Sequence, residues 1–163
     1  MADEPVVMEY EEVNQKQVVD LILSIQQQEY GVAISAEDQP DLFKIEEVYQ
    51  KGQGNFWVAT IEDKVVGTIS LLDIGGKNVA LRKMFVDKGF RGTTFNTAKL
   101  LLDTAKQWAI EQKVETIYLG TTPLFLAAHR FYVKHGFERI DQYKLPSGFP
   151  VLEVDKFFFK YEI

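Results

Sequence analysis

Two segments combine residue types and spacing that could bind and transform a small molecule. The first, residues 85–96, reads Phe-Val-Asp-Lys-Gly-Phe-Arg-Gly-Thr-Thr-Phe-Asn, a strand end followed by a glycine-containing turn and a helix start. Backbone N–H groups at a helix start are unpaired and attract anions, and Lys88 and Arg91 would add positive charge. The segment lacks the glycine-lysine ending of a Walker A loop, so on its own it leaves a plain turn with a Thr N-cap as the alternative.

The second segment, residues 127–137, places a tyrosine near the end of a helix. Tyr132 comes four residues before Gly136, which is suited to end the helix. A tyrosine there can bury its ring and present its hydroxyl to a cleft as a general acid. The alternative is an aromatic ring that only packs at a helix end. His129 and His135 flank the tyrosine without a third ligand, so no metal site is predicted.

The elements that must position these segments follow from the spacing of apolar residues. Strands are expected near 6–12, 55–61, 65–72, 78–86, 116–119, 137–145 and 151–161, and helices near 14–30, 40–51, from 95 onward, and from Thr122-Pro123 to 135. This order predicts a mixed α/β fold with a largely antiparallel sheet and one βαβ crossover. Residues 78–86 alternate less cleanly between apolar and polar side chains, and a two-residue period places Ala80, Arg82, Met84 and Val86 on one face. Lys83 then belongs to the opposite face.

Composition narrows the class of protein. The 163 residues suit one domain over 1–163, and 46% hydrophobic content is enough for a sizeable core. The absence of cysteine excludes disulfides and thiolate chemistry. Short apolar runs and an acidic start predict no membrane span and no signal peptide, so we expect a cytoplasmic protein.

Charge is distributed unevenly along the chain. Residues 1–50 carry 12 acidic and 2 basic side chains, net −10, whereas residues 77–113 carry 3 acidic and 8 basic ones, net +5. A basic middle in a protein of net charge −6 indicates a small anionic ligand rather than nucleic acid. The alternative is an uneven solvated surface.

The two segments together resemble the GNAT superfamily of acetyl-CoA-dependent N-acyltransferases. The resemblance is carried by Leu81-Arg82-Lys83-Met84-Phe85-Val86, by Phe90-Arg91-Gly92, and by Ala128, Phe131-Tyr132 and Gly136-Phe137. The order of elements from Val6 to Tyr161 fits that fold, a mostly antiparallel mixed sheet flanked by about four helices. The resemblance therefore covers nearly the whole chain.

The resemblance also implies a set of functional residues. Met84, Phe85 and Val86 would offer main-chain groups to acetyl-CoA, and the turn of Arg91, Gly92, Thr93, Thr94, Phe95 and Asn96 would hold its pyrophosphate. Tyr132 would protonate the departing thiolate. Thr94 and Asn96 stand where the family usually has glycine, and Phe125 stands where it often has asparagine. The Cβ atoms of Thr94 and Asn96 would crowd the phosphates, although their polar side chains could hydrogen-bond the phosphates instead. Phe125 would remove one polar contact with coenzyme A.

We therefore expect an N-acetyltransferase in which a small-molecule or peptide amine attacks acetyl-CoA directly. No metal, nucleic acid or membrane is expected to take part, and a homodimer is left open. Acidic side chains that could line the acceptor pocket are Glu29 (beside Tyr30), Asp73, Glu153 and Asp155. The acidic N-terminal third would then favour cationic amines. The rival hypotheses are a non-catalytic acyl-CoA sensor or partner-binding module on the same fold and a nucleotide-binding α/β protein.

Overall fold

The computed structural model describes residues 4–92 and 94–163, in which seven strands form one sheet in the order β1-β2-β3-β4-β5-β7-β6. The strands are β1 (Val6–Glu9), β2 (Asn55–Ile61), β3 (Lys64–Gly75), β4 (Asn78–Val86), β5 (Thr116–Thr121), β6 (Glu138–Ile140) and β7 (Phe157–Glu162). Neighbouring strands are antiparallel except β4 and β5, which run parallel with α3 as the crossover. The expected fold class is confirmed.

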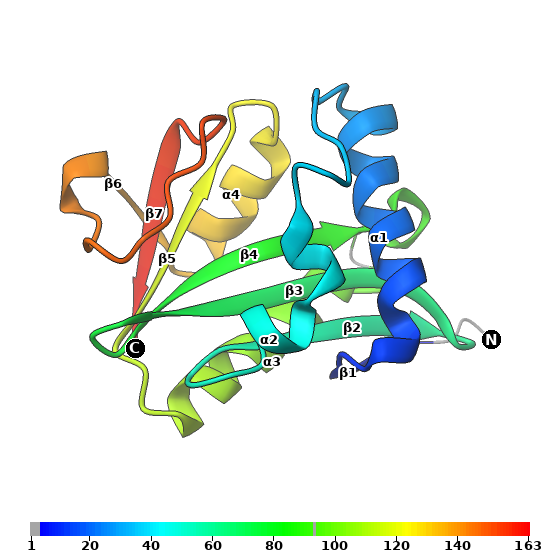
Figure 1. Cartoon of the computed structure of the whole chain (residues 1–163), viewed down its shortest axis with the longest axis horizontal. Helices are drawn as coiled ribbons and strands as arrows, with labels where there is room; N and C mark the ends of the chain where they lie inside the picture. Colours follow the sequence, from blue (N-terminus) through cyan, green and yellow to red (C-terminus); the bar gives the residue numbers. More distant parts are fainter. Residues whose placement is uncertain (1–3, 93) are drawn as a thin grey trace.

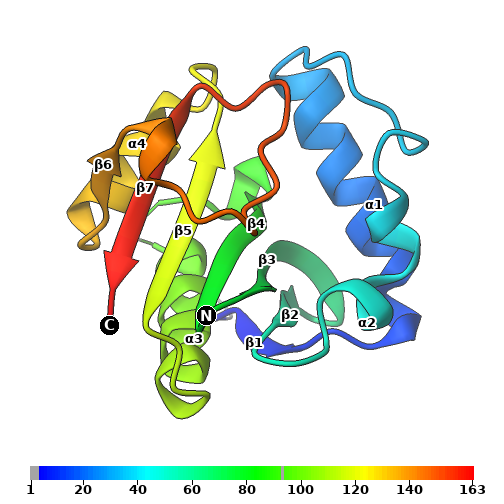
Figure 2. The same cartoon turned by 60° about the vertical axis from the view of Figure 1, so that its left-hand side comes forward.

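Helices cover both faces of the sheet (Figures 1 and 2). The helices are α1 (Gln15–Leu23), which continues as a π-helical turn over Ser24–Glu29, α2 (Ile45–Val48), α3 (Thr97–Glu111) and α4 (Leu126–Lys134). α1 and α2 bury Val18, Ile22 and Ile45 against one face. α3 buries Leu101 and Leu102 on the other, where the buried Tyr132 of α4 joins the same cluster.

Local sequence patterns predict most of these elements, and the helix expected over 40–51 is an exception. The β2–β3 hairpin turns through Glu62 and Asp63, both left-handed with φ of 50° and 65°, as the tight hairpin turn requires. The helix expected over 40–51 is shorter, a 3₁₀ turn at Pro40–Phe43 followed by α2.

The expected bounds of three elements near the C-terminus are wrong. Helix α4 starts at Leu126 rather than at Thr122-Pro123, because the Phe125 N–H closes a turn on the Thr122 carbonyl at 3.2 Å. Strands β6 and β7 are also shorter than expected, since the loop between them contains Pro146, Gly148 and Pro150.

Candidate active site

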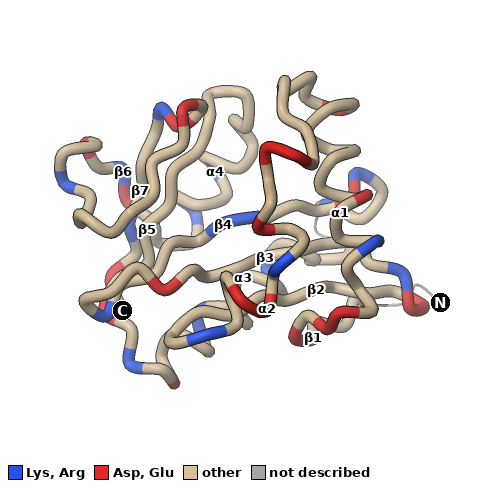
Figure 3. The backbone as a smooth tube through the Cα atoms, viewed as in Figure 1, with Lys and Arg blue, Asp and Glu red and all other residues tan. Residues whose placement is uncertain are grey.

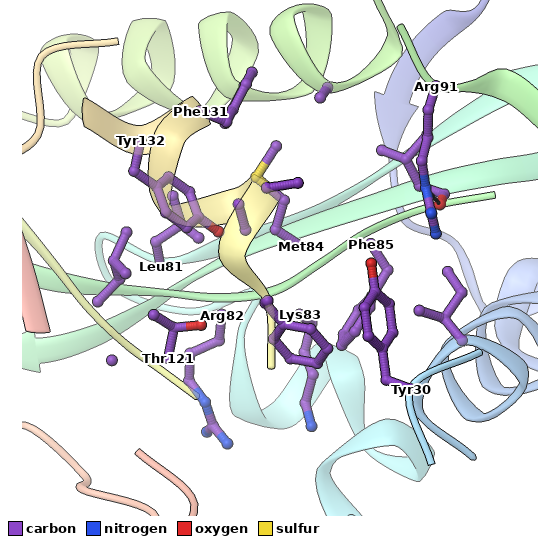
Figure 4. A pocket seen from close by; sticks show the side chains of 18 of the residues that line it. Tyr30, Leu81, Arg82, Lys83, Met84, Phe85, Arg91, Thr121, Phe131 and Tyr132 are labelled. Atoms are coloured by element: carbon purple, nitrogen blue, oxygen red, sulfur yellow. Dashed lines mark hydrogen bonds between the residues drawn. The ribbon is translucent and has the colours of Figure 1, made fainter. Parts of the chain in front are cut away.

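Strands β4 and β5 separate part of the way along their length. Their parallel pairing is confined to Asn78–Ala80 and Thr116–Tyr118, whereas β4 remains paired with β3 as far as Val86. Main-chain groups of β4 that face β5 beyond Ala80 therefore have no ladder partner among the described residues. A cavity of about 380 Å³ opens at this gap, between β4, β5, α4 and the residues leading to α3 (Figure 4).

A bulge interrupts β4 beside this cavity. Thr68 of β3 pairs with Phe85 and Ser70 pairs with Arg82, so β4 contains one extra residue between these pairs. Lys83 takes up the extra length in a left-handed conformation, with φ of 54°. The Thr68 hydroxyl donates to the Lys83 carbonyl at 2.6 Å, and the Ser70 hydroxyl donates to the Arg82 carbonyl at 2.7 Å.

The bulge changes which face each side chain occupies. Leu81, Met84 and Val86 belong to the core beneath α3, while Phe85 packs against the core beneath α1. In Figure 4 the Arg82 and Lys83 side chains lie together, pointing away from Met84 and Tyr132. The faces expected from a two-residue period are therefore wrong beyond Arg82, because one added residue shifts that period.

A second cavity, of about 130 Å³, adjoins the first. The walls common to both are Leu81, Arg82, Lys83, Phe85, Gly120, Thr121 and Phe125. Phe125 packs edge-on against Tyr30, with ring centroids 4.7 Å apart, and against Phe85 at 6.4 Å. The position where the family often has asparagine thus supplies an aromatic wall between the cavities.

Lys83 belongs to a buried polar network under the second cavity. Its Nζ donates to Gln39 Oε1 at 2.5 Å and lies 3.5 Å from Asp41 Oδ2. The Asp41 carboxylate also accepts the Tyr49 hydroxyl at 2.6 Å, and the amides of Gln39 and Gln26 pair with each other. Burial lowers the pKa of Lys83 to about 8, although the nearby Asp41 carboxylate favours the charged form.

Arg91 closes one side of the larger cavity by reaching to the end of the first helix. Its guanidinium binds Glu29 through two hydrogen bonds, Nη2 to Oε1 at 2.7 Å and Nη1 to Oε2, and its Nε donates to the Val86 carbonyl at 2.8 Å. These hydrogen bonds hold the pKa of Glu29 below its ordinary value. The pair ties the turn after β4 to the segment after α1.

Helix α3 begins without a side-chain cap. Asn96 occupies the N-cap position in a left-handed conformation, with φ of 52° and ψ of 26°, and its side chain accepts no hydrogen bond from the first turn. Thr97 instead donates its hydroxyl to the Phe90 carbonyl at 2.9 Å. Asparagine tolerates left-handed geometry better than most residues, so it can replace a glycine here.

Tyr132 lies where α4 meets the cavity. Its ring packs against Phe131, Phe137 and Phe159, with centroids 5.9, 5.5 and 6.3 Å away. Within the described residues its hydroxyl has no hydrogen-bond partner, and no side-chain polar atom is sealed away unpaired, so the hydroxyl opens to the cavity (Figure 4). Burial raises the pKa of Tyr132 above its ordinary value.

Comparison with known proteins decides the family. Residues 19–137 match the Acetyltransferase (GNAT) family. The chain belongs to this family. A Staphylococcus aureus acetyltransferase of the GNAT family superimposes with a TM-score of 0.93 at 40% identity, covering 97% of this chain and 98% of that one.

Two further comparisons concern a curated N-acetylaspartate synthetase and a structure solved with coenzyme A. N-acetylaspartate synthetase of Danio rerio is 35% identical over 125 residues, which are 74% of this chain and 43% of that protein. This chain therefore spans less than half of that relative. The PaiA N-acetyltransferase of Thermoplasma acidophilum, solved with coenzyme A, shares the fold with a TM-score of 0.78 at 14% identity, covering 99% and 100% of the two chains.

The structure brings together most of the residues that the GNAT resemblance implied for acetyl-CoA. Those that line the larger cavity are Met84, Phe85, Val86, Arg91, Gly92 and Tyr132. Thr94, Phe95 and Asn96 lie in the turn before α3 and are not among its walls, and Phe95 packs on Phe90 at 5.2 Å. Thr93 lies outside the described residues.

The residues expected around the acceptor are scattered. Tyr30 lines the larger cavity, whereas Glu29 is held by Arg91. Asp73 is not at either cavity, because it accepts hydrogen bonds from the N–H groups of Gln53 and Gly75 at the far end of β3. Glu153 is exposed in the loop before β7 and lines neither cavity, but Asp155 lines the second one.

Sequence reasoning did not assign Arg82, Lys83, Gln26 or Gln39 to a candidate site, although all four line the second cavity. The available signal was a pair of adjacent basic residues, Arg82 and Lys83, in the otherwise apolar sequence of β4. Figure 3 shows this basic pair midway along the strand. No group of three or more metal-ligating side chains occurs among the described residues. In the same residues no helix is long and apolar enough to cross a bilayer.

Proposed function

We propose that this chain transfers the acetyl group of acetyl-CoA to the amine of a small molecule. The observation that carries the proposal is the pair of adjoining cavities along the interrupted edge of β4, with the Tyr132 hydroxyl open to the larger one. A two-substrate reaction needs two such sites that meet at the reacting atoms.

The larger cavity fits a coenzyme A arm. Met84, Ala128 and Phe131 supply apolar walls for a flexible chain. The main-chain groups of β4 that are not paired with β5 would supply hydrogen bonds. The uncapped start of α3, together with Arg91, suits the pyrophosphate. Bound acetyl-CoA would supply a thioester whose carbonyl carbon is open to attack.

The residues of the chain then divide the work. The β4 main chain would stabilise negative charge on the acetyl oxygen. Such stabilisation lowers the activation free energy strongly where water is excluded. Because burial raises the pKa of Tyr132, its hydroxyl stays protonated at neutral pH and can donate toward the departing sulfur. The second cavity would hold the neutral amine beside the larger cavity, with which it shares lining residues.

Relatives narrow the acceptors worth assaying. The name N-acetylaspartate synthetase indicates aspartate as the acceptor of a protein 35% identical over 74% of this chain. L-Aspartate and other small amines are therefore the first acceptors to supply.

The decisive experiment follows thiol release from acetyl-CoA with each amine and identifies the acetylated product by mass spectrometry. Tyr132→Phe should keep coenzyme A affinity and lower kcat by roughly 10². Tyr143→Phe is the matched control, since Tyr143 is 80% exposed and lines neither cavity. A protein that binds acetyl-CoA and releases no thiol with any amine is instead an acyl-CoA sensor.

A further inference from the structure

The second cavity contains charges of both signs. Its charged side chains are Arg82 and Lys83 from β4 and Asp155 from the loop before β7. Its wall includes none of the acidic residues of the N-terminal third, although those had suggested a cationic acceptor. The charge that a ligand meets is therefore set by these three groups.

Lys83 is already compensated within the protein. It lies 3.5 Å from Asp41 and donates to Gln39, so the network beneath the cavity satisfies much of its charge. A ligand would gain little from a lysine whose partners are in place.

Arg82 is different, because its guanidinium has no hydrogen bond and no ion pair with any described residue. It is half-buried, and its contact with the protein is the Tyr49 ring, whose centroid lies 6.0 Å from Cζ. The bulge at Lys83 brings this side chain to the same side as Lys83 (Figure 4). A half-buried guanidinium with free donors favours an anion, and its planar fork matches a carboxylate.

Asp155 supplies the opposite charge in the same cavity. Its Oδ2 accepts the Leu152 N–H at 3.0 Å, and it lies so close to Gly120 that a Cβ there would fall 2.8 Å from Oδ2. Burial raises the pKa of Asp155, whereas the Leu152 N–H and the charge of Arg82 lower it. Among the described residues the two side chains form no direct ion pair, so each can still contact a ligand. A molecule with an amino group and a carboxylate complements this arrangement.

We propose that the second cavity selects amines that carry a carboxylate, with the carboxylate bound by Arg82 and the amino group facing Asp155. The proposal rests on the acetyl transfer proposed above and names its acceptor class. The volume of about 130 Å³ suits a small amino acid.

The test compares acceptors that differ by single groups. L-Alanine and β-alanine each carry one carboxylate, L-aspartate carries two, ethylamine carries none, and putrescine carries a second amine. The value of kcat/KM should be about 10- to 100-fold higher for the carboxylated amines than for ethylamine. Arg82→Gln should abolish that preference by raising KM, and Arg82→Lys should restore part of it.

Two further variants separate the roles. Asp155→Asn should lower kcat/KM for ethylamine and L-alanine alike, because it acts on the amino group that both share. Arg139→Gln is the matched arginine control, since Arg139 is exposed on β6 and lines neither cavity. Thermal unfolding of each variant checks that the fold is retained.

Each outcome bears on one proposal or the other. Rapid acetylation of ethylamine or putrescine, equal to that of L-alanine and unchanged in Arg82→Gln, overturns the carboxylate site and leaves acetyl transfer intact. If no amine is acetylated, acetyl transfer fails. Calorimetric titration of L-aspartate and L-alanine into the coenzyme A-saturated protein then decides the site: binding lost in Arg82→Gln supports it, and absence of binding refutes it.

Discussion

Arg91 and Glu29 form a two-hydrogen-bond ion pair although 62 positions separate them in the sequence. Arg91 comes from the turn that would hold the coenzyme A pyrophosphate, and Glu29 comes from the end of the π-helical turn after α1. Phosphate and Glu29 would therefore compete for one guanidinium. The carboxylate also places negative charge beside the expected position of an anionic ligand.

This competition predicts opposite effects for the two partners. Arg91→Gln should weaken coenzyme A binding by about 1–3 kcal/mol, the usual contribution of a charge-assisted hydrogen bond. Glu29→Gln should strengthen binding several-fold at low salt, and the gain should shrink as salt screens the charge. Calorimetric titration at two ionic strengths measures both. Equal weakening by both variants would mean that the pair holds the loop rather than competes with phosphate.

Asn96 replaces a glycine that the family usually has, in a left-handed backbone conformation. Asn96→Gly should leave stability within a few tenths of a kcal/mol, whereas Asn96→Ala should lower the free energy of unfolding by about 1 kcal/mol, because a Cβ without a polar side chain is disfavoured there. Urea unfolding of the two variants checks this. Indistinguishable Gly and Ala variants would contradict the backbone explanation.

Lys83 should make stability depend on pH in the alkaline range. Its pKa is lowered by burial and by Arg82, to about 8 from 10.5, so the folded state releases this proton before the unfolded state does. The cost of burying the charge is thus fully present below pH 8 and is relieved as the pH rises toward 10.5.

Lys83→Met tests this directly. The stability of the variant relative to the wild type should fall by up to about 3 kcal/mol between pH 7 and pH 10.5, at about 1.4 kcal/mol per pKa unit. Burial raises the pKa of Tyr49 above its ordinary value, so the Tyr49 hydroxyl should not mask the change. Urea unfolding curves whose difference is constant with pH would argue against a buried, titrating Lys83.

The bulge in β4 depends on two buried hydroxyls. Thr68→Val and Ser70→Ala should each lower the free energy of unfolding by about 1–3 kcal/mol, because each leaves a carbonyl of Lys83 or Arg82 without its partner. Thr104→Val is the control, since its hydroxyl binds a carbonyl on the exposed side of α3. Acetylation rates should fall with the first two variants if the bulge shapes the site; unchanged rates would separate the bulge from catalysis.

Short-range sequence patterns were sufficient to predict the positions of many helices and strands. The bounds of β4 agree with the expected 78–86, and the β2–β3 hairpin and the long helix α3 lie where two- and 3.6-residue periods placed them. Tyr132 likewise lies near the end of a helix that stops shortly before Gly136, as expected. These features depend on residues within one or two turns of each other, so the sequence by itself determined them.

The charge and shape of the second cavity were decided by tertiary structure. Whether Arg82 and Lys83 share a face depends on a bulge held by Thr68 and Ser70 of the neighbouring strand. The compensation of Lys83 comes from Asp41, and the opposing charge comes from Asp155 near the other end of the chain. No periodicity within a segment records contacts between distant segments, so only the folded chain could show that Arg82 has no ion pair among the described residues.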